Sequence, residues 1–600
     1  MTNRSPLSGR YTREELHNEA RALLGVLEGV GDLESARRAL YEAVGRIQYG
    51  LFDTPASLSQ TQQIRARDCA NVLRGMLLPR SAKVAGFDMA QALWDVQRGA
   101  ARDDLQPGFW ADVTHLVEGL FGRAPSAPIE EDDIFDELTG REAAIQRSAD
   151  LDALWERVER HAARFESGLS ETARARRAER KRRVLEALGG TEKDWSDWRW
   201  QRAAVLQSVP RLAKAVKLSP EALGLVERAR QGHLPFGVTP YYASLMDDDP
   251  EAGRDRAIRA QVLPTARYVE AMVENREQRG EAFDFMGEHD TSPIDLITRR
   301  YPAIVILKPF NSCPQICTYC QRNWEIDDAS SCHEATPEEN LDKAIAWIED
   351  HPAIHDVLVT GGDPLSLGDD DLERLLGRLA KIPHLDLIRI GTRTPVTMPM
   401  RITEPLAAML GRLREPGRRD VAVVTHFEHV YEITDEAVAA VDRLKRNGLS
   451  VYNQHVYNFF VSRRFESVAL RMLLRRVGID PYYTFVPKGK EELSDYRVPI
   501  ARILQERKEE ARLIPGMRRT DEPVYNVPRL GKNHIRAMQH RDLLAIRGDG
   551  ARVYEFHPWE KNIVERDPYV AFDAPILDYL ERLAALGEDP GRYVGIWYYF

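Results

Sequence analysis

Cysteine is scarce in this chain, with five residues in 600, and five are too few for a disulfide framework. Long apolar runs are also missing, because no window approaches the ~20 apolar residues of a membrane span. The opening residues, MTNRSPLSGRYTREEL, lack the apolar segment of a secretory signal. Positive charge is not in excess, since the formal net charge is −10, which argues against general nucleic-acid binding. We therefore expect a cytoplasmic protein that binds neither membrane nor nucleic acid.

Residues 1–190 show apolar residues at intervals of three and four, as in LESARRALYEAVGRI, which predicts an all-α N-terminal extension. The sequence assigns no chemistry to this extension. Its basic run RARRAERKRR (174–183) is flanked by acidic residues, which favours a solvated helix face over an RNA site. The aromatic tail GIWYYF (595–600) is expected to pack into a core or interface, because exposed aromatic residues at this density are unfavourable.

A different pattern begins near residue 296. Six strand-like runs alternate with amphipathic helical stretches: AIVILKPF, DVLVTGG, LDLIRIGT, VAVVTHF, LSVYNQHV and PYYTFVP. Serial βα repeats predict parallel strands with helical crossovers, and six repeats indicate a partial (β/α)6 barrel over 296–500. A helical segment over 191–295 precedes this barrel, and a C-terminal segment over 501–600 follows it.

Polar or glycine residues stand at the end of each of these strand runs or just after it. Because the carboxyl ends of barrel strands meet on one face, these residues are expected to form an active site. In strand order they are Cys313, Cys317 and Cys320; Gly361, Gly362 and Asp363; Thr392 and Arg393; His426; Gln454; and Lys488.

The three cysteines have the spacing C-x3-C-x2-C, which indicates a metal. A structural zinc site needs four ligands, and Cys332 or His333 lies near enough in sequence to supply the fourth. Closely spaced thiolates also hold iron–sulfur clusters. A [4Fe–4S] cluster with three protein ligands leaves one iron open for another ligand.

This motif, placed after the first strand of a partial barrel, resembles the radical S-adenosylmethionine (SAM) superfamily, whose SAM chelates the open iron. Nine segments narrow the resemblance to the lysine 2,3-aminomutase family over about 194–560. They are WRWQ, FGVTPYYASLMD, QVLPTA, RYP, VLVTGGDPL, IRIGTRTPV, THFEHVYEIT, NQHV and PYY. The extension before residue 190 lies outside this resemblance.

The resemblance implies an isomerase that moves an amino group between neighbouring carbons of an amino acid. It implies three cofactors: a [4Fe–4S] cluster on the three cysteines, SAM and pyridoxal phosphate (PLP). It also implies a low-potential electron donor of the flavodoxin or ferredoxin type, and a homo-oligomer. The additional zinc-binding cysteines of the family are missing here, with Arg464 at the first of those positions, so no such zinc site is expected.

The resemblance also assigns roles to individual residues. Lys532 matches the PLP lysine, although the family's glycine run before it is replaced by Pro-Arg-Leu-Gly. Arg322 matches the residue that binds the substrate α-carboxylate, a role that suits a guanidinium fork. Arg300 and Tyr301 match a pair near the PLP phosphate. The positions expected around SAM are Gly361, Gly362, Asp363, Thr392, Arg393, His426 and Gln454.

Two further positions bear on the substrate. Lysine-acting members hold the substrate ammonium with two aspartates, and the matching residues here are Lys488 and Asn526. A cationic side chain beside Lys488 would be repelled in a low-dielectric site, whereas a carboxylate would be paired. The same Lys and Asn pair resembles the glutamate 2,3-aminomutase branch. The sequence therefore predicts reversible conversion of L-glutamate to β-glutamate, with lysine or another amino acid as the alternative substrate. A non-catalytic zinc-binding module, with Cys332 or His333 as fourth ligand, is the remaining alternative.

Overall fold

The largest sheet of the computed structural model has nine strands in chain order, β1 to β9, where β9 spans Gly531–His534. Strands β2 to β8 are parallel to one another, and β1 is antiparallel to β2 at the edge. The structure describes residues 7–53, 58–125, 138–326, 329, 337–487, 491–558 and 566–600. The strands are β1 (Ile297–Thr298), β2 (Ile304–Phe310), β3 (Asp356–Gly361), β4 (Leu387–Gly391), β5 (Asp420–Thr425), β6 (Ser450–Val456), β7 (Asp480–Val486) and β8 (Glu522–Val527).

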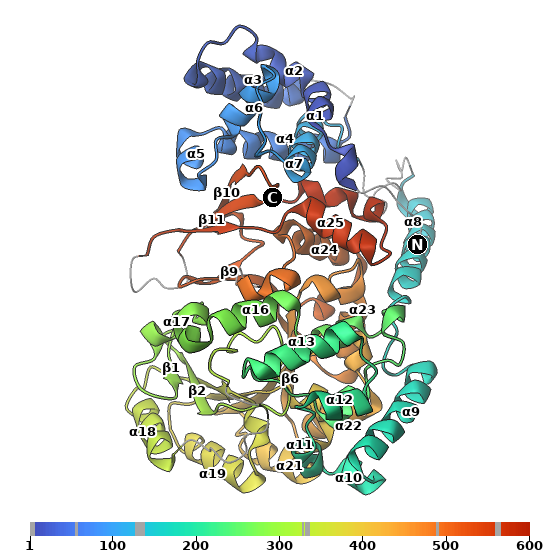
Figure 1. Ribbon diagram of the computed structural model, residues 1–600, viewed down its shortest axis with the longest axis vertical. Helices are drawn as coiled ribbons and strands as arrows, with labels where there is room; N and C mark the ends of the chain where they lie inside the picture. The colour runs from blue at the N-terminus through green and yellow to red at the C-terminus, as the bar shows by residue number, and fades with distance from the viewer. Residues whose placement is uncertain are drawn as a thin grey trace. The chain divides into compact units, whose positions relative to one another are not determined.

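The six strands expected from the sequence are β2 to β7, and helices follow them as the βα pattern predicts (Figure 1). One core joins the outer faces of the strands to these helices; it contains, for example, Val357 of β3, Ile388 of β4 and Leu376 of α19. The helices are α18 (Glu338–Glu349), α19 (Asp369–Leu379), α20 (Thr394–Thr397), α21 (Glu404–Arg412), α22 (Asp435–Arg446) and α23 (Glu466–Val477). The α/β partial barrel is confirmed. The additional strand β8 contains Pro523, which weakens its strand signal in the sequence.

The chain divides into two compact units. The barrel unit comprises Arg160–Tyr496 and Ile514–Gly531, so it begins thirty residues before the predicted boundary at 190. Its helices before the sheet are α9 (Glu171–Leu188), α10 (Glu192–Ser196), α11 (Trp198–Ala203), α12 (Val209–Ala215), α13 (Pro220–Gln231), α14 (Pro240–Ala243), α15 (Arg256–Ala260), α16 (Ala266–Glu274) and α17 (Arg279–Phe283).

Helix α9 carries the basic run, and the expectation of a fully solvated face is wrong. Arg177 and Arg180 are buried; Arg180 donates to the carbonyl of Ser244 at 2.7 Å and to the hydroxyl of Tyr431 at 3.0 Å. Arg182, by contrast, is exposed. Arg177 and Arg180, three positions apart on one face of α9, therefore pack against the rest of the barrel unit. The composition of the run does not show which of its arginines are buried.

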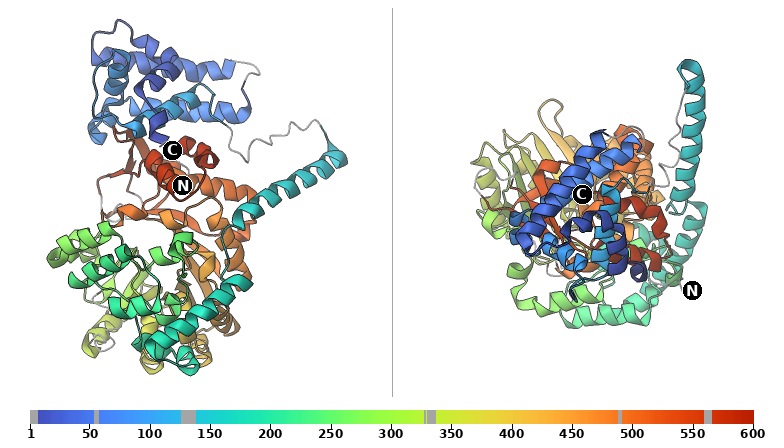
Figure 2. Two further views of the ribbon diagram at one scale, coloured as in Figure 1. Left: turned by 45° about the vertical axis from the view of Figure 1, so that its right-hand side comes forward. Right: turned by 90° about the horizontal axis from the view of Figure 1, so that it is seen from above.

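The second unit joins the N-terminal helices to the C-terminal segment and comprises Met1–Glu159, Arg497–Leu513 and Lys532–Phe600. The N-terminal helices (blue) and the C-terminal segment (red) lie side by side in Figures 1 and 2 and share one apolar core. Its helices are α1 (Arg13–Glu19), α2 (Arg21–Leu24), α3 (Leu33–Asp53), α4 (Gln60–Met76), α5 (Pro79–Ala85), α6 (Met89–Gln97), α7 (Pro107–Leu120), most of α8 (Gly140–Ala162), α24 (Ile500–Leu513) and α25 (Ile576–Ala585). A three-stranded antiparallel sheet of β10 (Arg541–Ile546), β11 (Arg552–Phe556) and β12 (Tyr569–Phe572) completes the unit.

The aromatic tail packs in this core, as its composition predicts. Trp597 stacks on His115 of α7 with ring centroids 4.7 Å apart, and Phe600 is buried. Arg552 fixes the tail by donating to the carbonyls of Trp597 at 2.7 Å and Tyr599 at 2.6 Å. Across the described ranges, no helix is both long and apolar enough to cross a membrane.

Asp112 of α7 is expected to stabilise this unit strongly. It forms a fully buried bidentate ion pair with Arg552, and both contacts measure 2.8 Å. Removing one partner of a buried pair leaves an uncompensated charge, so Asp112→Ala should destabilise the unit by about 3–5 kcal/mol. Hydrogen exchange of peptides from α7 and the tail should show faster opening. The control Asp104→Ala breaks the more exposed Arg102–Asp104 pair and should cost less than about 1 kcal/mol. Equal protection of α7 against hydrogen exchange in the two variants would contradict the prediction.

Candidate active site

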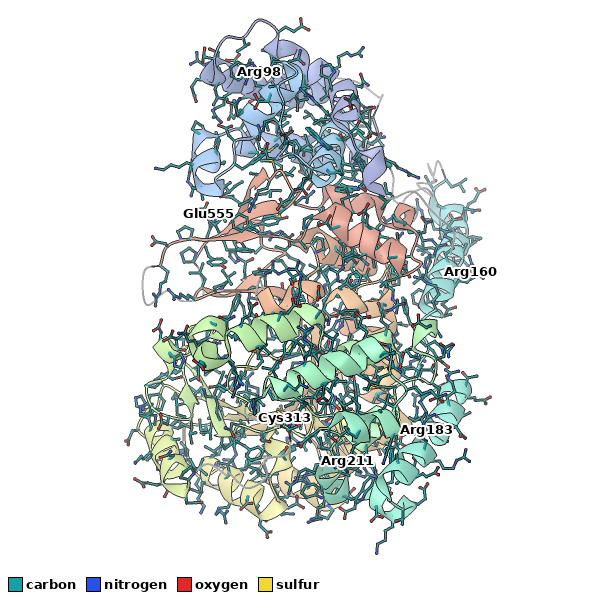
Figure 3. The ribbon with its side chains drawn as sticks, viewed as in Figure 1. Arg98, Arg160, Arg183, Arg211, Cys313 and Glu555 are labelled. Carbon is teal, nitrogen blue, oxygen red and sulfur yellow. The ribbon has the colours of Figure 1, made fainter. Side chains whose placement is uncertain are left out.

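The cysteine loop follows β2 and is held by backbone contacts with the preceding helical segment. Ile316 donates its N–H to the carbonyl of Gly237 at 3.0 Å, and Thr318 donates its N–H to that of Gln261 at 2.9 Å. The Thr318 hydroxyl also donates to the carbonyl of Ala260 at 2.7 Å. Cys313 lies within the barrel unit (Figure 3). The loop is therefore attached to residues outside the βα repeats, and two of its supports belong to the predicted family segments.

The glycine pair after β3 allows the cysteine loop to approach the neighbouring strand end. Gly361 has a φ of 116°, which an L side chain rarely adopts, and a Cβ on Gly362 would collide with the backbone of Ser312. The N–H groups of Gly362 and Asp363 donate to the carbonyls of Phe310 and Ser312, at 2.5 and 3.0 Å. These glycines are required for close contact between β3 and the loop that carries Cys313.

Asp363 is buried and directs its carboxylate at the turn after β4. It accepts hydrogen bonds from the hydroxyls of Thr392 at 2.6 Å and Thr394 at 2.9 Å, and from the N–H of Arg393 at 3.0 Å. Burial raises its pKa, while these donors act in the opposite direction. Asp363 thus positions Arg393 beside the cysteine loop.

Arg393 connects three elements at the barrel mouth. Its Nη1 donates to the Sγ of Cys317 at 2.9 Å, its Nη2 pairs with Glu432 at 2.8 Å, and its Nε donates to the carbonyl of His426 at 3.3 Å. The side chain is buried, so its charge acts through a low-dielectric medium.

The loop fits an iron–sulfur cluster. Burial raises the pKa of the Cys313 thiol, so bound metal cations would have to stabilise its thiolate. Thiolates of Cys313, Cys317 and Cys320 would hold the cluster, and Arg393 would donate to one of these ligands, the Sγ of Cys317. The backbone N–H of Arg322 donates to the Sγ of Cys320 at 3.3 Å. Cys332 and His333, the alternative zinc ligands, lie outside the described residues.

Replacing Arg393 with methionine should make a reconstituted cluster harder to reduce, because reduction adds negative charge that this arginine stabilises. A charge-assisted hydrogen bond contributes about 1.5–3 kcal/mol, which sets an upper limit of roughly 130 mV for one electron. Anaerobic redox titration followed by electron paramagnetic resonance measures the potential. Arg401→Met removes another buried arginine, bonded to the carbonyls of Leu365 and Leu367, and should leave the potential unchanged. An unaltered potential in Arg393→Met would contradict the prediction.

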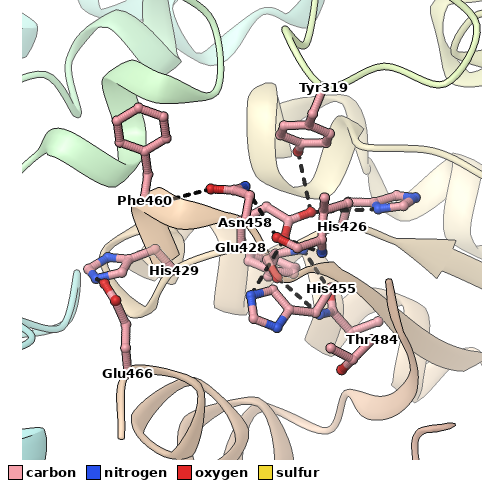
Figure 4. Close-up of polar contacts among 12 residues, drawn as sticks. Tyr319, His426, Glu428, His429, His455, Asn458, Phe460, Glu466 and Thr484 are labelled. Atoms are coloured by element: carbon pink, nitrogen blue, oxygen red, sulfur yellow. Dashed lines mark hydrogen bonds and ion pairs between the residues drawn. The ribbon is translucent and has the colours of Figure 1, made fainter. Parts of the chain in front are cut away.

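Glu428 is a buried carboxylate that links the cysteine loop to the ends of β5 and β6 (Figure 4). It accepts hydrogen bonds from the hydroxyl of Tyr319 at 3.3 Å and from the N–H of Val456 at 2.6 Å. The Nδ1 of His426 and the Nε2 of His455 each lie 3.7 Å from its oxygens. Burial alone would raise the pKa of Glu428, but His426, His455 and Arg393 lower it overall. Sequence reasoning identified His426 and missed Glu428, although Glu428 stands two residues after it.

A second group of charges lies around Arg322 and Arg300. Arg322 pairs with Glu325 at 2.9 Å and with Glu288 at 3.2 Å, and Arg300 pairs with Glu288 at 2.7 Å. Lys308 of β2 contacts both glutamates. Sequence reasoning missed Glu288, Lys308 and Glu325. A signal existed for Lys308, which is the one charged residue in the strand run AIVILKPF.

The remaining predicted residues are placed as follows. Gln454 lies on β6 next to a register irregularity and pairs with Tyr483 of β7, and Tyr301 lies just before β2. Asn526 is buried on β8. Lys532 is half-buried on β9 (Gly531–His534) and belongs to the other unit, so its role stays a prediction. Lys488 lies outside the described residues.

The chain is similar to known proteins. Residues 307–461 match the Radical SAM superfamily. An uncharacterized KamA family protein of Methanocaldococcus jannaschii is 42% identical and covers 96% of this chain and 95% of its own length. That similarity includes the N-terminal extension.

Two characterised activities are found among shorter matches. Glutamate 2,3-aminomutase of Clostridioides difficile is 36% identical over 52% of this chain and 69% of its own length. L-lysine 2,3-aminomutase of Fusobacterium nucleatum is 34% identical over 52% of this chain and 70% of its own length. Radical SAM chemistry requires a cluster, so these similarities decide between the two metal alternatives in favour of [4Fe–4S].

Proposed function

Because the chain belongs to the KamA family of radical SAM aminomutases, we propose that it interconverts L-glutamate and β-glutamate by 2,3-migration of the amino group. The family makes it an isomerase that uses a [4Fe–4S] cluster, SAM and PLP. Bound together, these cofactors supply the radical chemistry that breaks an unactivated C–H bond and stabilises the migrating nitrogen. The protein then has to bind the substrate, orient it and exclude water.

The choice of substrate rests on the residue types at two positions that the family resemblance assigns to the substrate side chain, Asn526 and Lys488. Asn526 is buried on β8 and offers an amide donor. An amide donor together with a lysine would suit a carboxylate and oppose an ammonium group.

The family resemblance supplies the other proposed roles. Arg322 would bind the α-carboxylate, Arg300 and Tyr301 would hold the PLP phosphate, and Lys532 would hold PLP. Gly361, Gly362, His426 and Gln454 would contact SAM, while Asp363 and Thr392 would position Arg393 for the cluster. The electron donor is a flavodoxin or ferredoxin, and the enzyme assembles as a homo-oligomer.

An amino-acid panel tests this function. Anaerobically reconstituted protein is incubated with SAM, PLP, reductant and 13C-labelled L-glutamate, L-aspartate or L-lysine, and the products are identified by nuclear magnetic resonance. We expect β-glutamate, with none formed when SAM is omitted. Formation of β-lysine without β-glutamate would overturn the choice of substrate and leave the reaction class intact. Loss of SAM dependence would overturn both.

A further inference from the structure

Three cations and two carboxylates meet on and around β2, where the predicted carboxylate anchor Arg322 lies. The cations are Arg300, Lys308 and Arg322, and the carboxylates are Glu288 and Glu325. The side chains are 19% exposed at most. One positive charge is therefore in excess in a largely desolvated region, which favours an anionic ligand.

Glu325 bridges two of these cations with its two oxygens. Its Oε1 binds the Nζ of Lys308, and its Oε2 accepts from the Nη1 of Arg322 at 2.9 Å. Each oxygen thus has its own cationic donor. Any carboxylate of similar size could make the same two charge-assisted contacts.

The two glutamates differ in how firmly they are held. Glu288 is 3% exposed and contacts all three cations, Arg300 at 2.7 Å, Arg322 at 3.2 Å and Lys308 at 3.6 Å. Burial would raise its pKa, but Arg322, Arg300 and Lys308 lower it to about 2. Glu325 has a more exposed side chain and contacts only Lys308 and Arg322 among these cations. It also lies in the turn after the cysteines, where its N–H bonds the carbonyl of Arg322 at 2.9 Å. Glu288 is thus a fixed part of the network, and Glu325 is the carboxylate that can leave.

We propose that Glu325 occupies the substrate α-carboxylate position in the substrate-free enzyme, and that Lys308 is a second anchor for that carboxylate beside Arg322. The incoming carboxylate displaces Glu325 and takes over its two contacts, so the charge of the network is unchanged by the exchange. Glu325 competes with the substrate and excludes amines that lack a carboxylate. This inference rests on the proposed amino-acid chemistry, but it applies to any α-amino acid.

The alternative is a purely structural ionic network. The two hypotheses differ in how Glu325→Gln should change the affinity for amino acids. If Glu325 competes with the substrate, Glu325→Gln should tighten amino-acid binding about tenfold, since a neutral amide holds the cations less strongly. Lys308→Met should weaken binding by about tenfold. If the network is only structural, Glu325→Gln should leave binding unchanged or weaken it.

Equilibrium binding tests the proposal without turnover. Protein loaded with PLP and cluster, but without SAM and reductant, is titrated with L-glutamate, L-lysine and L-alanine, and the PLP absorbance spectrum is followed. Iron and PLP contents are measured for each variant. Glu339→Gln is the matched control, because it removes an exposed Glu–Lys pair on α18; its affinities should equal those of the unmodified protein.

The outcomes separate the two proposals. Tighter binding of L-lysine than of L-glutamate, with Glu325→Gln still tightening both, would overturn the glutamate assignment and support the two-cation anchor. Unchanged or weaker binding of every amino acid by Glu325→Gln would overturn the anchor, whichever substrate is preferred. Failure of all three amino acids to bind either protein would also overturn it.

Discussion

Cys317→Ser is expected to abolish turnover, with a loss of about 10⁴-fold or more. A serine hydroxyl is not deprotonated near neutral pH and does not replace a thiolate as an iron ligand. Without the cluster, the reaction would require breaking an unactivated C–H bond unaided, and the rate should fall to background. The iron content and the electron paramagnetic resonance signal of the reduced cluster should fall together with product formation.

Cys69→Ala is the matched control for this change. Cys69 is fully buried in the unit formed by the N-terminal helices and the C-terminal segment, and burial raises the pKa of its thiol to about 12, so we expect it to take no part in the reaction. The control should keep its iron and its activity after correction for folded protein. Retention of both the cluster signal and turnover by Cys317→Ser would refute the assignment of the three cysteines.

The barrel could be predicted from sequence because each of its strands carries its own signal. The apolar runs that became β2 to β7 are bounded by helices with clear apolar faces, and polar or glycine residues stand near the strand ends, as do Gly361 at β3, Thr392 after β4 and His426 after β5. The strand β8 (Glu522–Val527) was missed, since it contains a proline near its start and is not followed by a helix of the repeat.

Contacts between distant segments were beyond sequence reasoning. Glu288 lies in an irregular segment and becomes significant only because folding brings it to Arg300 and Arg322. The Asp112–Arg552 pair joins residues 440 positions apart, so no local pattern could show that the N-terminal helices and the C-terminal segment form one unit. The prediction of a solvated face for the basic run of α9 was wrong for the same reason, because Arg180 is buried while Arg182 is exposed.

Asn526→Asp, combined with Lys488→Asp, should reverse the substrate preference. Asn526 is buried on β8, so an aspartate there would face the carboxylate of bound glutamate with little screening. Repulsion between like charges about 4 Å apart costs roughly 4 kcal/mol at an effective dielectric constant of 20. The kcat/KM for L-glutamate should therefore fall about 10²- to 10³-fold, while β-lysine formation from L-lysine should appear or increase.

The single and double variants divide this effect between the two positions. Asn526→Asp alone should lose most glutamate turnover if Asn526 contacts the side chain, and adding Lys488→Asp should chiefly raise lysine use by removing the repelling cation. Asn340→Asp makes the same chemical change on the outer helix α18 and should leave both rates unchanged. Because this comparison measures a ratio of two substrates in one protein, a loss of folded or reconstituted enzyme cancels. Unchanged selectivity in the double variant would therefore mean that these two positions do not recognise the substrate side chain.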